Sequence, residues 1–340
     1  MQRIRELAVQ AANATNNAAD RASLDKEVQT LLDEIGRISF QTEFNNSAIL
    51  DGTLNPLFFQ VGANQGQTIA LEGADARPAK LGTSEKVAGD PNSIPQGLSQ
   101  AELKQLAEQG ATVMDIIISV AGLTNDFYVN LSGKDIRSLD EMVREINAAI
   151  SEKASAEPIA EARIVQEAQL KASLRVLDDG STTIVINGAF ATTAAPNPPD
   201  PAAVFSVGGG DLGSPAFAAG TKTMFPDPVP DNNAKQVNLT QLNVTTRESA
   251  YKTIGAIDGA LDQIRGFRAN LGAAQSRLES TITNLQVSSE NISAARSRIR
   301  DTDFAAETAE LTRVQILQQA GTSVLAQANA APQSVLSLLQ

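Results

Sequence analysis

Apolar residues recur at helical spacing from the first turn of this chain. Ile4, Leu7, Ala8 and Ala11 fall on one stripe, which predicts an amphipathic helix. Neither a polar cap nor an acidic first turn introduces the stripe, although such groups normally satisfy the free N–H groups at a helix start. We interpret the segment as part of a helix whose beginning lies upstream or is supplied by another chain.

A second helix is predicted after the polar segment ATNNAADRAS. Residues 20–38 carry apolar residues at helical spacing, and Asp20 is the expected N-cap. The next segment ends in a turn at Asp51 and Gly52, and LFFQVGANQGQTIAL then predicts a hairpin of two short strands around residues 62–66. The chain therefore begins with two helices followed by a small sheet.

Residues 83–236 follow a different pattern. Ser99 with Glu102, and Ser138 with Glu141, form possible capping boxes that predict two helices. Four segments read as strands, namely VMDIIISVAG, DFYVNLSG, ARIVQEAQLKASLRVL and TTIVINGAF, and an Asp-Asp-Gly turn joins the last two. We expect an α+β domain here, with an extended Pro- and Gly-rich loop over residues 191–233.

The C-terminal third carries the strongest periodic signal. Apolar residues recur there at a strict spacing of seven, which indicates a helix that supercoils with a partner helix. The opening helix of the chain is the expected partner. We call this repeat the seam, and it consists of Ile257, Ile264, Leu271, Leu278, Leu285, Ile292 and Ile299.

A further helix is predicted after a break at residues 301–303. Its polar positions are almost wholly uncharged after Arg313, which is typical of a helix covered by other protein rather than by water. We interpret it as an assembly element, although it could also fold onto its own domain. Its apolar positions are Phe304, Leu311, Val314, Leu317, Val324, Leu325, Val335 and Leu338.

These patterns together predict a mainly α fold with an α+β insertion. Residues 1–82 and 237–300 would form one long antiparallel helical bundle or coiled coil with small β-hairpins. Residues 83–236 would form an outer α+β domain, and residues 301–340 would form the terminal assembly helix. We expect residues 1–52 and 240–300 to pack against each other, because the first helix and the seam each lack a partner nearby in the sequence.

Composition excludes several classes of function. The chain has 27 Lys and Arg against 39 Asp and Glu, a net charge of −12, which disfavours nucleic acid as a partner. It has no Cys and no His, so thiolate nucleophiles, Ser-His-Asp triads and the usual zinc sites are absent. No apolar run is long enough to span a bilayer, and no secretory leader is visible. We expect no enzymatic activity.

Four stretches of this sequence resemble bacterial flagellin. They are QRIRELAVQAAN, TEFNNSAILDG, FQVGANQGQTIAL and the closing NISAARSRIRDTDFAAETAELTRVQILQQAGTSVLAQANAAPQSVLSLLQ. Where the family has Asn-Gly, this chain has Asn45-Asn46, and we expect the same turn because Asn also tolerates a left-handed backbone. FYVNLSGKDIRSLDEMVREINAAI and the segment after it are similar to an insertion module of flagellins and hook-associated proteins.

The resemblance implies a structural subunit of the extracellular flagellar filament, exported without a cleaved signal peptide. Implied partners are other flagellin subunits, an export chaperone, the filament cap and the innate immune Toll-like receptor for flagellin. The receptor motif of the family falls on Arg3, Leu7 and Glu27. Flagellins have helical segments upstream of QRIRELAVQ and their C-terminus ends like this one, so we expect an N-terminally truncated chain that does not polymerise alone.

Two other functions stay open at this point. The outer domain could bind a surface polysaccharide, such as a polyuronate, or a host surface, although the net charge would oppose binding of an acidic glycan. The chain could also be a protein of the hook–filament junction. No cofactor is expected, apart from a divalent cation that the acidic loop at residues 227–231 could hold; this loop lacks a recognisable ligand spacing.

Overall fold

A computed structural model describes the chain except for residues 63–65, 72, 90–96, 157, 191–204, 211, 216–223, 226–233 and 338–340. Within helices and strands, the side chains of residues 214–215, 301–303 and 331–337 are also left undescribed. The chain divides into two compact units. Unit 1 comprises Met1–Leu57 and Leu71–Leu271, and unit 2 comprises Phe58–Ala70 and Gly272–Gln340.

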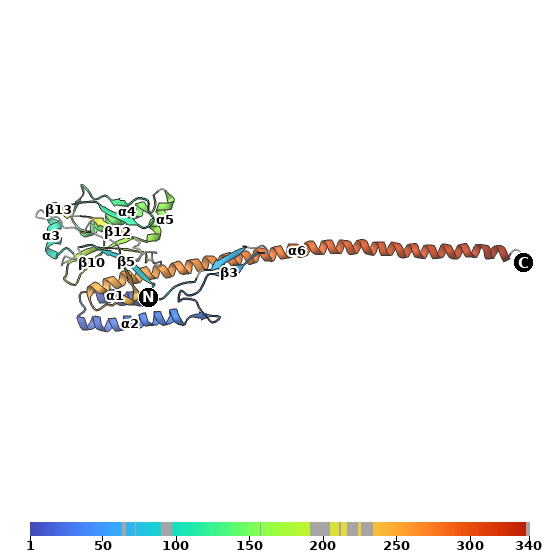
Figure 1. The fold of residues 1–340 in the computed structure, drawn as a ribbon, viewed down its shortest axis with the longest axis horizontal. Coiled ribbons are helices and arrows are strands. Elements are labelled where there is room, and N and C mark those ends of the chain that lie inside the picture. Colours follow the sequence, from blue (N-terminus) through green and yellow to red (C-terminus); the bar gives the residue numbers. More distant parts are fainter. Residues whose placement is uncertain are drawn as a thin grey trace. The chain divides into compact units, whose positions relative to one another are not determined.

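Unit 1 contains a helical bundle made from the two ends of its sequence. Helices α1 (Gln2–Ala12) and α2 (Ala18–Gln41) pack against the first turns of α6 (Arg247–Ser337). Figure 1 shows the three helices side by side. Ile4, Leu7 and Ile257 are at most 1% exposed in this apolar core, and Ile264 and Phe267 pack on its border. The predicted packing of residues 1–52 on the later helix is therefore confirmed, but only as far as Phe267.

The two helix starts differ as their sequences differ. Helix α1 has no side-chain cap and no acidic residue in its first turn, as predicted. Helix α2 begins at Asn17, whose side chain accepts from the backbone N–H of Asp20 at 2.9 Å, while the Asp20 carboxylate accepts from the Asn17 N–H at 3.1 Å. The prediction of Asp20 as N-cap was wrong, because Asp20 is the third helical residue of a capping box.

Two small hairpins follow, the first in unit 1 and the second mostly in unit 2. In unit 1, β1 (Glu43–Phe44) pairs with β2 (Ser47–Ala48) around Asn45 and Asn46, which have φ of 51° and 63°. The predicted turn is therefore confirmed, since both Asn residues take the left-handed backbone. Strands β3 (Leu57–Gln60) and β4 (Thr68–Leu71) form the second predicted hairpin.

The insertion is an α+β domain, as predicted. Its four-stranded sheet has the order β10-β11-β5-β14, and two three-stranded sheets have the orders β12-β7-β8 and β13-β6-β9. The strands are β5 (Gly82–Val87), β6 (Ala111–Val113), β7 (Ile116–Val120), β8 (Phe127–Val129), β9 (Asp135–Ile136), β10 (Lys171–Val176), β11 (Thr182–Gly188), β12 (Phe205–Gly209), β13 (Leu212–Pro215) and β14 (Lys235–Asn238). Helices α3 (Gln100–Gln109), α4 (Leu139–Lys153) and α5 (Ile159–Ala168) accompany them, and the short 3-10 helix η1 (Leu239–Gln241) follows β14.

The two capping boxes of the insertion form to different degrees. Ser99 and Glu102 exchange both bonds at the start of α3. At the start of α4, Ser138 accepts from the Glu141 N–H at 3.2 Å, but the Glu141 carboxylate accepts from the N–H of Arg137 instead. Both helices therefore begin where the sequence predicts, and only the first has the complete box.

Two predictions inside the insertion were wrong. ARIVQEAQLKASLRVL is not one strand, because α5 ends at Gln169, which has φ of 49°, and β10 begins at Lys171. Part of the predicted loop at 191–233 is packed structure, since β12 and β13 lie within it and Phe205 and Phe225 are fully buried. Aromatic residues at these two positions supply enough apolar area to order short strands between Pro-rich stretches.

The predicted break at residues 301–303 was also wrong. Helix α6 continues through Asp301, Thr302 and Asp303 to Ser337. The segment lacks both Pro and Gly, and the weak helix preference of Asp and Thr costs only about 0.5 kcal/mol per residue, which a long helix tolerates. The sequences assigned to the bundle and to the terminal helix are thus parts of one element.

Candidate functional site

Helix α6 exposes a long set of apolar side chains beyond the bundle core. We call it the exposed apolar set, and each member is at least 43% exposed. It consists of Leu271, Ile282, Leu285, Val287, Ile292, Ile299, Phe304, Leu311, Val314, Ile316, Leu317, Val324 and Leu325. Apolar exposure on this scale is typical of a surface that another protein covers.

Only the first two residues of the seam lie in the bundle core. Ile257 is fully buried and Ile264 packs on the same core, whereas Leu271, Leu285, Ile292 and Ile299 belong to the exposed apolar set. The seam member Leu278 is half-buried. Of the residues predicted for the terminal helix, Val335 and Leu338 lie outside the described side chains. The other predicted members are exposed, so the surface expected to need a cover is uncovered in the single chain.

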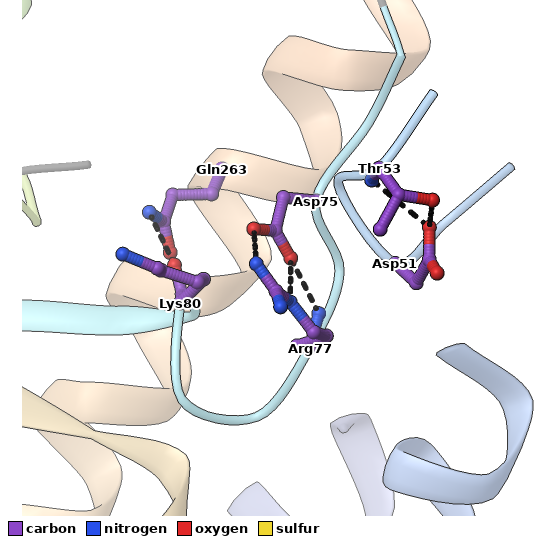
Figure 2. Close-up of polar contacts among 6 residues, drawn as sticks. All are labelled: Asp51, Thr53, Asp75, Arg77, Lys80 and Gln263. Atoms are coloured by element: carbon purple, nitrogen blue, oxygen red, sulfur yellow. Dashed lines mark hydrogen bonds and ion pairs between the residues drawn. The ribbon is translucent and has the colours of Figure 1, made fainter. Parts of the chain in front are cut away.

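A polar cluster fixes the loop that leads from the bundle to β5 (Figure 2). Arg77 donates to the Asp75 carboxylate from Nε at 2.9 Å and from Nη2 at 2.6 Å. Asp51 accepts from the Thr53 hydroxyl at 2.7 Å. These bonds hold the pKa of both carboxyl groups below the usual range, that of Asp75 chiefly through Arg77 and that of Asp51 chiefly through Thr53.

Gly52 and Gln263 also contact this loop. Gly52 has φ of 70°, and a Cβ there would lie 2.5 Å from the Asp75 carboxylate, so only glycine fits the turn. Gln263 of α6 accepts from the Gly82 N–H at 2.9 Å and donates to the Lys80 carbonyl oxygen at 3.4 Å. The first strand of the insertion is therefore anchored directly to α6.

The three residues expected to contact a receptor differ in exposure. Arg3 and Glu27 form an ion pair of 2.9 Å, and their side chains are 56% and 45% exposed. Leu7 is 1% exposed in the bundle core, so its side chain offers no surface to a partner. The assignment of Leu7 as a contact residue is corrected accordingly: it holds the helix that presents Arg3.

A groove of about 620 Å³ lies within unit 1 between the polar side of the four-stranded sheet and α6. Under it, Arg175 and Glu85 form a buried ion pair of 2.6 Å. Lys171 at its edge is exposed and has no ion pair with any residue that the structure describes. The Oδ1 of Asn187 is buried and has no hydrogen-bond partner in the described part of the chain. Four basic side chains and two carboxylates line the groove, namely Arg5, Lys171, Arg175, Arg265, Asp258 and Asp262.

Sequence reasoning did not find this groove, although one signal for it exists. Along β10, Ala172 and Leu174 pack into the insertion core, while Lys171, Ser173 and Arg175 alternate with them. Such alternation places three polar side chains on one side of the sheet. It does not reveal that α6, far away in the sequence, closes the other side.

Metal binding has little support in the described part of the chain. No group of three or more Asp and Glu side chains there is arranged to hold a metal ion. The acidic loop at 227–231, which could hold a cation, lies outside the described residues. Among the described helices, none is long and apolar enough to cross a membrane.

Two regions of the chain match known family models. Residues 1–55 match the bacterial flagellin N-terminal helical region, and residues 254–339 match the bacterial flagellin C-terminal helical region. Full-length similarity extends across the insertion as well. Flagellin B of Vibrio anguillarum is 32% identical over 342 residues, which cover 100% of this chain and 76% of that protein. Flagellin D of the same species is 34% identical over 340 residues, with coverage of 100% and 76%.

Solved structures of flagellar proteins have lower sequence identity to this chain and superpose on it with low TM-scores. FliC from Burkholderia pseudomallei is 21% identical, covers 81% of this chain and 92% of its own, and superposes with a TM-score of 0.39. A flagellar hook associated protein-3 from Legionella pneumophila is 15% identical, covers 88% and 87%, and has a TM-score of 0.41.

The Asp75–Arg77 pair predicts a pH-dependent contribution to stability. Because folding lowers the Asp75 pKa, the pair stabilises the fold above the unfolded carboxyl pKa of about 3.9 and loses this effect as pH falls through the lower folded pKa. Asp75→Asn should therefore reduce the free energy of unfolding by about 1 to 2 kcal/mol at pH 7, but by almost nothing near pH 2. Urea denaturation at a series of pH values measures both proteins.

Asp33→Asn is the matched control, because Asp33 is exposed and has no ion pair among the described residues. Its effect on unfolding should be small at every pH. A deficit in Asp75→Asn that stays constant from pH 7 to pH 2 would contradict the assignment.

Proposed function

This chain belongs to the bacterial flagellin family and is a structural subunit of the extracellular flagellar filament, and we propose that it assembles through the exposed apolar set of α6. The relatives that are 32% and 34% identical along its whole length are flagellins, so a role at the hook–filament junction is not favoured. The observation that carries the proposal is the length of uncovered apolar surface, from Leu271 to Leu325.

Energetics favour covering this set by other subunits. Fully burying one Leu, Ile, Val or Phe side chain is worth about 1.5 to 3 kcal/mol. Even partial burial of the exposed apolar set would exceed the cost of bringing two subunits together, which is about 4 to 15 kcal/mol. Apolar helical faces of neighbouring subunits are the natural cover, because a filament places many copies of the same helices side by side.

Substitution of one member of the exposed apolar set tests this assembly surface. Leu317→Asp should abolish or strongly reduce filament formation, because a carboxylate at a buried subunit contact loses its hydration without gaining a partner. Its neighbour Gln318 is also exposed, and Gln318→Asp adds the same charge without removing an apolar contact. Electron microscopy gives the readout for filaments from strains whose only flagellin is this chain, extended upstream by the helical segments that flagellins have, with each substitution in turn.

Equal filament numbers from Leu317→Asp and from the unsubstituted protein would contradict the proposal. Loss of filaments in both variants would attribute the effect to charge alone. Circular dichroism of the two purified monomers should be indistinguishable, because neither side chain packs in the monomer.

We also propose the export and accessory partners of flagellins for this chain. The partners are an export chaperone and the filament cap, and the chain is secreted without a cleaved signal peptide. The absence of Cys, so that no disulfide needs to form, is compatible with export as an unfolded chain. The absence of His and Cys together supports a purely structural role without enzymatic activity.

Recognition by the innate immune Toll-like receptor for flagellin is a further proposal, supported by the exposed Arg3–Glu27 pair. Arg3→Ala should lower receptor signalling in a reporter cell line and leave unfolding nearly unchanged, since exposed ion pairs contribute little to stability. Leu7→Ala should instead lower stability by about 2 to 5 kcal/mol, as expected for a buried side chain.

Arg144→Ala is the control for receptor signalling, because Arg144 is exposed on the insertion and has no ion pair among the described residues. If Arg3→Ala and Arg144→Ala signal equally well, Arg3 takes no part in recognition.

We further propose that the groove between the sheet and α6 binds an acidic surface polysaccharide such as a polyuronate. Its supporting feature is Lys171, which has no ion pair with any described residue and would meet a sugar carboxylate. The net charge of the chain opposes such a ligand at long range, but the groove itself has more basic than acidic side chains.

Lys171→Glu should reduce affinity for a polyuronate by about tenfold or more at low salt, with a smaller difference at high salt. Lys26→Glu on α2 adds the same charge change at an exposed position outside the groove. Isothermal titration with polyuronate oligomers compares the two variants. Equal affinity of both for the oligomers would exclude the groove as the binding site.

A further inference from the structure

Unit 2 contains a second groove, and no member of the exposed apolar set lines it. It has a volume of about 460 Å³ and lies between the β3–β4 hairpin and α6. The hairpin side is formed by Val61, Gly66, Gln67, Thr68 and Ile69, and the helix side by Ser276, Arg277, Ser280 and Thr281. Ile69 is 5% exposed, so the hairpin contributes one buried apolar residue, while the whole helix side is polar.

The helix side of this groove carries hydrogen-bond donors without acceptors. Arg277 is exposed, and its guanidinium has no ion pair or hydrogen bond to any residue that the structure describes. The hydroxyls of Ser276 and Ser280 likewise have no partner in the described part of the chain. Only the Thr281 hydroxyl is used, since it donates to the Arg277 carbonyl oxygen at 2.8 Å.

The spacing of these donors brings them together. Residues four apart on a helix lie on the same side, one turn above the other, so Ser276 and Ser280 are neighbours and Arg277 lies beside them. Several other arginines are paired within the described part of the chain, for example Arg5 with Asp258, Arg77 with Asp75 and Arg313 with Glu310. Arg277 thus remains available to an acceptor from outside the subunit.

The charge of the chain indicates what that acceptor is. Each copy has 39 Asp and Glu against 27 Lys and Arg, so the surface of a neighbouring copy offers more carboxylates than basic groups. The planar guanidinium fork binds a carboxylate through two parallel hydrogen bonds. We propose that a carboxylate side chain of a second copy of this chain enters the groove and pairs with Arg277, with Ser276 and Ser280 as additional donors. The proposal rests on the function as a filament subunit.

Regrowth of filaments on preformed seeds tests this contact. Each protein, extended upstream by the helical segments that flagellins have, is purified from a strain in which it is the only flagellin; the proteins are unsubstituted, Arg277→Gln, Arg277→Lys and Arg296→Gln. Arg296 is the matched control, because it is an exposed arginine of α6 without a described partner and does not line the groove. The critical monomer concentration for regrowth is measured at several salt concentrations, and the thermal unfolding of each monomer is recorded.

Arg277→Gln should raise the critical concentration about fivefold at low salt, the scale of one exposed ion pair between subunits. Arg277→Lys should recover part of this loss, Arg296→Gln should stay within about twofold, and the loss should shrink as salt rises. An unchanged critical concentration for Arg277→Gln, or an equal loss for Arg296→Gln, would overturn the proposal. A lower melting temperature of the Arg277→Gln monomer with normal regrowth would assign Arg277 a role inside the subunit instead.

Failure of the unsubstituted protein to regrow on seeds would be a different result. It would contradict the assembly function itself, and with it the contact that depends on that function.

Discussion

The burial of α1 and α2 against the first turns of α6 is the interaction on which the rest of unit 1 depends. It joins residues from opposite ends of the unit, as the ion pair between Arg5 and Asp258 illustrates over a sequence separation of 253 residues. Closing so long a loop costs conformational entropy, although the cost grows only slowly with loop length. Fully buried side chains such as Ile4, Leu7 and Ile257 supply the opposing free energy. Every other element of unit 1 lies in sequence between these helices.

A polar layer separates this core from the core of the insertion. The two apolar clusters share no residue, and between them lie the buried Arg175–Glu85 pair and the buried Asn187 Oδ1. A buried ion pair contributes less to stability than apolar packing of the same volume, but removing one partner is costly. The ion pair therefore fixes how the insertion meets the bundle, while the insertion keeps an apolar core of its own.

Local periodicity predicted most of the helices, and it failed where a distant contact decides the outcome. The repeat of seven predicted the part of α6 from Ile257 to Ile299, yet it could not show that the bundle core ends near Phe267, because that limit depends on packing against helices remote in sequence. Strand-like composition misassigned residues 159–168, since Ile and Val fit a strand and a buried helix equally well. The groove residues Lys171, Asn187 and Arg277 were beyond prediction for the same reason: each gains its significance from a partner element remote in sequence.

The insertion leaves and re-enters the bundle through β5 and β14, which pair directly, with Gly82 opposite Asn238. Neighbouring strands lie about 4.8 Å apart, so the two points of attachment are almost in contact. A domain whose own ends are equally close could be exchanged at this position without moving the helices beneath it. The sequence of the insertion can then change while the helices of the bundle keep theirs.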